Sequence, residues 1–174
     1  MKKYRILFLV GRDRPGIAED VSAFLFERGA NIEDSRMAAL GGRFSVMTLF
    51  SCTSERLDVI TKELDRLTML GFEASIHEAE DPNAIPRQPG LPLKLEVISM
   101  DHPGIVQKVV SILHRRNVNI QTLDTRVTKA PLSGASLFDL TLEADVPAGT
   151  SISTVKEELL QLAAEMNLDL NFLK

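Results

Sequence analysis

A stretch of this chain occurs twice, 88 residues apart, and the repeat limits the folds available to it. Asp13-Arg14-Pro15-Gly16-Ile17 returns as Asp101-His102-Pro103-Gly104-Ile105, and Asn31-Ile32 returns as Asn119-Ile120. Nine of 20 consecutive positions are identical in the two copies, namely Asp13, Pro15, Gly16, Ile17, Val21, Leu25, Arg28, Asn31 and Ile32. Average composition would give about one or two such identities by chance. A repeat of this length indicates a duplicated small domain.

The first copy has the pattern of a β-α-β-β-α-β unit. Ile17, Val21, Phe24 and Leu25 form one apolar helical stripe, and Gly41-Gly42 permits a tight hairpin turn. The predicted elements are a strand at 4–10, a helix between Pro15 and Gly29, strands at 31–40 and 43–51, one helix from near Ser54 to Gly71, and a strand at 72–77.

The second copy repeats this order, with predicted strands at 93–99, 119–128, 136–144 and 168–173. Residues 79–92 between the copies contain four prolines and few large apolar residues, so we expect a semi-stiff spacer without a central strand. The predicted domains are therefore 1–78 and 93–174. The predicted fold is α+β, with two ferredoxin-like units, each a four-stranded antiparallel sheet with two helices on one face.

Composition narrows the function. The net charge of -4 argues against direct binding of nucleic acid, which needs a concentrated basic surface. The single cysteine, Cys52, excludes an intrachain disulfide and fits a reducing compartment, so we expect a cytoplasmic protein. The N-terminal apolar run is only five residues long and is followed by Arg12, which predicts neither a signal peptide nor a membrane span.

The repeated turn has the chemistry to bind a small zwitterion. A helix N-terminus suits a carboxylate, and a glycine leaves room for close approach. Asp13 or Asp101 can accept from an ammonium group, and Asn31 or Asn119 can both donate and accept. We expect these repeated residues to gather at one end of each domain. The alternative is that Asp caps the helix, Pro-Gly makes a turn and Asn occupies a bend.

Arg14 and His102 occupy the same place in the two turns. Each could contact a ligand carboxylate, or each could be a solvated loop side chain. Catalysis has little support, because the three histidines lack metal-ligand spacing and no nucleophile elbow or glycine-rich phosphate loop occurs. We therefore expect no enzyme activity, no metal and no cofactor, and we place Cys52 in the core.

Asp-x-Pro-Gly-Ile after the first strand and Asn-Ile at the second strand, both present twice, resemble the ACT domain family of small-molecule sensors. The resemblance implies that an amino acid such as glycine or serine binds between the turn and a neighbouring ACT unit. Gln121-Thr122 replace Glu33-Asp34 in the second copy, so the two sites should differ. The residues implied in ligand binding are Asp13, Arg14, Gly16, Ile17, Asn31, Ile32, Asp101, His102, Gly104, Ile105, Asn119 and Ile120.

The resemblance implies a freestanding regulator, since no catalytic domain follows in this chain. It would act on a protein partner, a transcription factor or an enzyme, and the sheet edges could be protected by pairing within one chain or in a homodimer. One alternative is the regulatory subunit of an amino-acid biosynthetic enzyme. A remote alternative is an acylphosphatase-type hydrolase, for which Arg12 and Arg14 are the candidate phosphate-binding residues.

Overall fold

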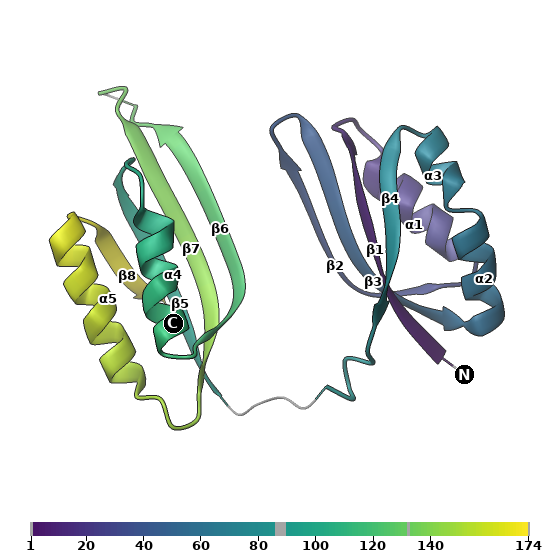
Figure 1. The fold of residues 1–174 in the computed structure, drawn as a ribbon. Helices are drawn as coiled ribbons and strands as arrows, with labels where there is room; N and C mark the ends of the chain where they lie inside the picture. The colour runs from purple at the N-terminus through teal and green to yellow at the C-terminus, as the bar shows by residue number, and fades with distance from the viewer. Residues whose placement is uncertain (1, 86–89, 132, 174) are drawn as a thin grey trace. The chain divides into compact units, whose positions relative to one another are not determined.

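The computed structural model describes residues 2–85, 90–131 and 133–173. The chain divides into two compact units, Met1–Pro86 and Arg87–Lys174. Each unit holds a four-stranded antiparallel sheet with helices on one face (Figure 1). The α+β fold class and its two ferredoxin-like units are thus confirmed.

The first domain has its strands in the order β2-β3-β1-β4. Both β1 and β2 pair antiparallel with β3, so β1 and β2 run in the same direction. The side chains of the predicted helical stripe are buried against the sheet. The elements are β1 (Lys2–Arg12), α1 (Ile17–Glu27), β2 (Asn31–Leu40), β3 (Arg43–Thr53), α2 (Ser54–Lys62), α3 (Asp65–Met69) and β4 (Phe72–Ala79).

The single second helix predicted for this domain is interrupted between α2 and α3. At the break, backbone hydrogen bonds join residues three apart in sequence in place of four. The Leu64 N–H donates to the Thr61 carbonyl, and the Arg66 N–H donates to the Glu63 carbonyl. Such tightening is the 3₁₀ pattern. Ile60 and Leu67 on the two sides are nevertheless both buried, so the predicted apolar face is kept.

The second domain has the strand order β6-β7-β5-β8 and a single long second helix. That helix begins after Ser151, whose hydroxyl accepts from the Thr154 N–H at 3.3 Å. The elements are β5 (Gly90–Met100), α4 (Ile105–Arg115), β6 (Asn119–Lys129), β7 (Ser136–Pro147), α5 (Ile152–Met166) and β8 (Asp169–Leu173).

The predicted spacer ends earlier than expected, because β5 already begins at Gly90. Pro92 lies in this central strand, opposite Asp145 of β7. On its other side, β5 pairs with β8 only from Lys94 onward. Pro92 therefore sits where the strand has one neighbour, a position that tolerates a residue without an N–H. Pro86 and Pro89 of the predicted spacer lie outside the described residues.

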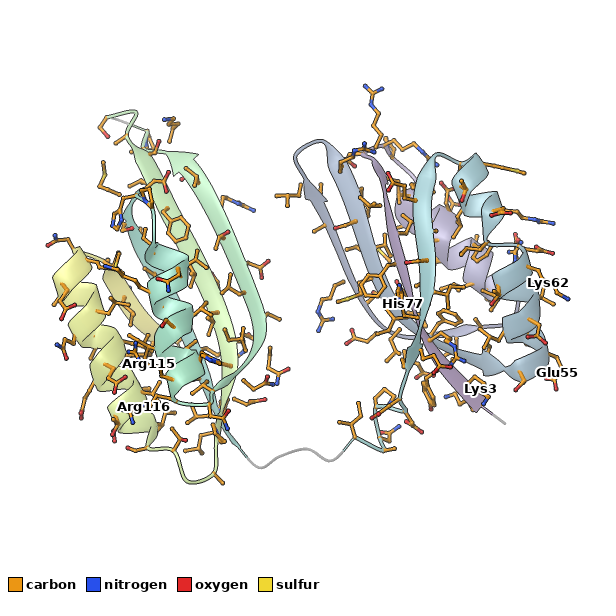
Figure 2. The ribbon with its side chains drawn as sticks, in the orientation of Figure 1. Lys3, Glu55, Lys62, His77, Arg115 and Arg116 are labelled. Carbon is orange, nitrogen blue, oxygen red and sulfur yellow. The ribbon has the colours of Figure 1, made fainter. Side chains whose placement is uncertain are left out.

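Most of the repeated positions have structural roles. The pairs Ile17 and Ile105, Val21 and Val109, and Leu25 and Leu113 are at most 2% exposed. Arg28 and Arg116 each join the first helix of a domain to the segment that contains its second. The Arg28 Nε donates to Glu63 at 3.1 Å, and the Arg116 Nε donates to Glu158 at 3.0 Å. Arg116 directly follows α4, and Figure 2 shows it in the region where α4 lies beside α5.

No helix in the described parts of the chain is both long and apolar enough to cross a membrane. Cys52 is 6% exposed and packs in the first core, as predicted. Its burial raises the pKa of the thiol.

Candidate functional site

The repeated turn joins the end of a central strand to the first helix in each domain. In the first domain, Asp13 donates its backbone N–H to the Gly42 carbonyl at 3.0 Å, which ties the turn to the β2–β3 hairpin. Gly16 precedes α1 with φ 90° and Gly104 precedes α4 with φ 99°. A side chain at Gly104 would meet nothing within 4 Å, so glycine is needed there for its conformation.

The N-termini of α1 and α4 lack a side-chain cap, so the Asp13 and Asp101 carboxylates do not serve as caps. The first helical bonds run from the Asp20 N–H to the Gly16 carbonyl and from the Lys108 N–H to the Gly104 carbonyl. Amide groups ahead of these bonds have no partner within the helix. Such groups, with the positive end of the helix dipole, can hold a carboxylate.

The two turns differ in charge. Arg14 donates to Asp20 at 2.6 Å, and its guanidinium lies 5.3 Å from the centre of the Phe72 ring. Glu19 and Asp20 both lie in the first turn of α1, whereas the first turn of α4 contains no acidic residue. The α4 N-terminus is therefore the more favourable of the two for an anion.

His102 replaces Arg14 in the second turn. Its Nδ1 lies 3.3 Å from the Pro103 carbonyl. In the first turn, a ligand carboxylate would have to compete with Asp20 for the Arg14 guanidinium.

Asn31 lies at the opposite end of the sheet from the turn, so the expected gathering of the repeated residues at one end is wrong. Asn31 pairs with Ser51, which pairs with Tyr4 near the start of β1. Asp13 follows the end of β1 and lies nine residues beyond Tyr4, about 30 Å along a strand. The reason is the direction of the strands: α1 returns the chain to the end at which β1 began.

The second domain shows the same separation. Asn119 pairs with Asp145, which pairs with Pro92 at the beginning of β5. Asp101 comes after Met100, at the other end of that strand. The turn and the asparagine of one domain therefore cannot contact the same small ligand.

The isoleucines of the predicted site have unequal access. Ile17 and Ile105 are each 2% exposed, so only their backbone amides could reach a ligand. Ile120 packs partly against the second core, while Ile32 is 37% exposed.

A charged cluster near Asn31 was not anticipated from the sequence. Glu33 is the extra residue of a β-bulge between Ile32 and Asp34. It accepts from the Ser51 hydroxyl at 2.5 Å and from the Lys2 ammonium at 2.9 Å. These bonds, with a contribution from Asn31, lower the pKa of Glu33 to about 2. Lys2 and Ser51 are distant from Glu33 in the sequence, so no local pattern predicts these contacts.

The second domain has a bulge at the same place. Its extra residue, Gln121, donates to the Asp145 carboxylate at 2.7 Å. A bulge side chain therefore holds both strand starts. In the first domain the bulge residue Glu33 carries the carboxylate, whereas in the second the carboxylate belongs to Asp145 on the neighbouring strand. Among the described residues, no group of three His, Cys, Asp or Glu side chains is placed to hold a metal ion.

The chain belongs to the ACT domain family. Models of the ACT domain match residues 4–77 and 94–164, which together cover more than half of the chain. It is an ACT-domain regulatory protein related to the glycine cleavage system transcriptional repressor of Escherichia coli (strain K12). The two are 25% identical over 166 residues, which span 94% of this chain and 86% of that protein.

Two solved structures match this chain over nearly its whole length. An unknown protein from Galdieria sulphuraria is 28% identical, with a TM-score of 0.84 over 99% of this chain and 98% of that one. A protein provisionally named glycine cleavage system transcriptional repressor is 23% identical, with a TM-score of 0.72 over 100% of this chain and 99% of that one. At 23% identity, the second structure supports the fold of this chain alone.

Proposed function

We propose that this chain is an amino-acid-sensing regulator. It binds a small amino acid, with glycine and serine as the first candidates, between the turn of one ACT domain and the asparagine of a neighbouring ACT domain. The neighbour can belong to the same chain or to a second one. The observation that carries the proposal is the exposure of Asp13, Asn31, Asp101 and Asn119, polar residues kept in both copies that take no part in either core.

The turn and the asparagine supply complementary groups. The free amides at the helix N-terminus receive the ligand carboxylate, and the Asp carboxylate receives its ammonium. The asparagine closes the site from the neighbouring domain, because its own domain holds it at the far end of the sheet. The two sites have unequal affinities, since acidic residues lie in the first turn of α1 only.

The ligand acts by changing how ACT domains associate. It can shift that equilibrium only by the difference between its affinities for the two arrangements. The target we propose is a protein that regulates transcription of genes for glycine and one-carbon metabolism, as the name of the Escherichia coli relative suggests. A net charge of -4 favours action through a protein over direct contact with DNA. We further propose that the chain has no catalytic activity and works in the cytoplasm.

A thermal-shift screen of the full chain against the 20 amino acids tests the proposal. A ligand at 100 times its dissociation constant stabilises the folded state by about 2.7 kcal/mol, which raises the melting temperature measurably. A selective rise with glycine or serine supports an amino-acid sensor. The absence of any shift would count against it.

A further inference from the structure

The face of each sheet that carries no helix, its open face, differs sharply between the two domains. In the first domain, Leu7 and Leu9 point toward the helices and are buried, while the alternate residues point away. The centre of this open face consists of Ile6, Phe8, Met47 and Leu49, with Phe8 opposite Met47 and Ile6 opposite Leu49. Phe8 is 39% exposed and Met47 is 41% exposed.

The second domain has polar residues at the same four places. Glu96 lies opposite Thr141, and Lys94 lies opposite Glu143. Lys94 and Glu143 also form a salt bridge at 2.6 Å. The second domain therefore has the same fold with polar residues at the centre of its open face. The fold does not require the four apolar residues that the first domain has at these positions. An apolar patch that the fold does not need indicates a contact surface.

The rim of the first open face is charged in a self-complementary way. The edge strand β2 carries Asp34 level with Ile6 and Arg36 level with Phe8. The other edge strand, β4, carries His77 level with Ile6 and Glu73 level with Val10. Figure 2 shows His77 on this strand, where its ring meets that of Phe8 edge-on at 5.1 Å. The cation Arg36, which pairs with Asp34 of its own strand at 2.6 Å, thus lies on one edge and the anion Glu73 on the other.

We propose that the first open face is where two copies of this chain associate. A two-fold axis parallel to the strands places Met47 against Phe8 and Leu49 against Ile6 of the second copy. It also places Asp34 opposite His77 and Arg36 opposite Ser75, with Glu73 two residues further along the same edge and within reach of the long Arg36 side chain. The result is an aligned sheet sandwich with the sheets about 10 Å apart.

The size of the face suits a reversible dimer. Four strands about 4.8 Å apart and about 30 Å long give a face of roughly 580 Å². Two such faces bury about 1,200 Å², at the lower end for specific interfaces. The inference is independent of the proposed ligand, because it concerns the open face and neither the turn nor the asparagine.

Sedimentation of the full chain over a range of concentrations tests the proposal. The native chain should form a detectable dimer when its concentration is raised to about 100 μM. The double variant Phe8→Glu/Met47→Thr introduces the second domain's own residues, and it should weaken the dimer at least tenfold. Glu96→Gln, on the open face of the second domain, is the matched control and should leave association unchanged. A native chain that stays monomeric, or a dimer indifferent to the double variant, overturns the proposal.

Charge exchange across the rim provides a second test at exposed positions. Arg36→Glu and Glu73→Arg should each weaken the dimer, because each places like charges together. Combining them in one chain should restore association, because each copy of a two-fold pair supplies both residues. Failure of the combined variant to recover overturns the proposed two-fold arrangement. Circular dichroism spectra of the three variants check that each is folded, so that loss of association is not loss of structure.

Discussion

Asp13 and Asn31 lie at opposite ends of the first sheet, although the chain repeats both residues together. Asp13 follows the last residue of β1, and Asn31 is level with Tyr4 near its first. A single small amino acid cannot bridge about 30 Å of strand. If both residues bind one ligand, they belong to different ACT domains, and the ligand reports on their association.

We expect Asp20→Ala to increase carboxylate binding at the first turn. The change removes the partner that holds Arg14 at 2.6 Å and takes a negative charge from the first turn of α1. Calorimetric titration of the variant with the amino acid found by screening should show a tighter site. The exposed ion pair itself contributes at most about 1 kcal/mol, so the melting temperature should change little. A weaker site would show that Asp20 serves the ligand directly.

We expect Arg28→Ala to destabilise the first domain by about 2 kcal/mol. The Arg28 side chain is 7% exposed, donates to the Phe24 carbonyl at 2.7 Å and lies 4.0 Å over the Phe24 ring. Its loss would remove the hydrogen bond to the Phe24 carbonyl and leave Glu63 without its main partner. Urea unfolding followed by circular dichroism measures the change.

The equivalent change in the second domain, Arg116→Ala, should cost less. The Arg116 side chain is 42% exposed, and exposed ion pairs are worth about 0 to 1 kcal/mol. Arg115→Ala, at the last residue of α4 and with its guanidinium 4.0 Å from the same Glu158 carboxylate, measures how much of that cost is due to charge without a hydrogen bond. Equal losses of stability in Arg28→Ala and Arg116→Ala would show that burial of the arginine does not determine the cost.

We expect Ser51→Ala to raise the pKa of Glu33 toward its ordinary value of 4.5. The Ser51 hydroxyl is the first cause of the lowering, ahead of Lys2 and Asn31. Because the native pKa of about 2 lies below the ordinary value, Glu33 stabilises the fold fully above pH 4.5. This contribution is lost as the pH falls toward about 2.

Two measurements check this prediction. Carboxyl NMR titration should show the upward shift in Ser51→Ala. Unfolding of Glu33→Gln should depend less on pH than that of the native chain between about pH 5 and pH 2. An unshifted Glu33 in the Ser51 variant would show that Lys2 and Asn31 suffice.

The sequence predicted the elements well because their signals are local. The stripe of Ile17, Val21 and Leu25 has the helical period, and all three are buried as that period requires. The break between α2 and α3 was not predicted. Hydrogen bonds between residues three apart replace helical ones there, but Ile60 and Leu67 are both still buried, so the apolar pattern shows no interruption.

The site was harder to predict, because its geometry depends on strand direction and distant partners. Residues that are repeated together need not lie together in the folded domain: Asp13 and Asn31 are at opposite ends of the sheet. The Ser51–Glu33 bond joins two strands, and the bulge that places Glu33 there has no signature in the sequence.

Calorimetric titration of the full chain with glycine and serine tests the central claim most directly. The native chain should bind one of them saturably. Asp13→Ala, Asn31→Ala, Asp101→Ala and Asn119→Ala should be measured beside it, with unfolding midpoints as the control for folding. The account predicts that affinity falls when the turn or the asparagine is changed, while the midpoints of the unliganded variants stay near that of the native chain. Binding that is unaffected by all four substitutions, or no binding by the native chain, would contradict it.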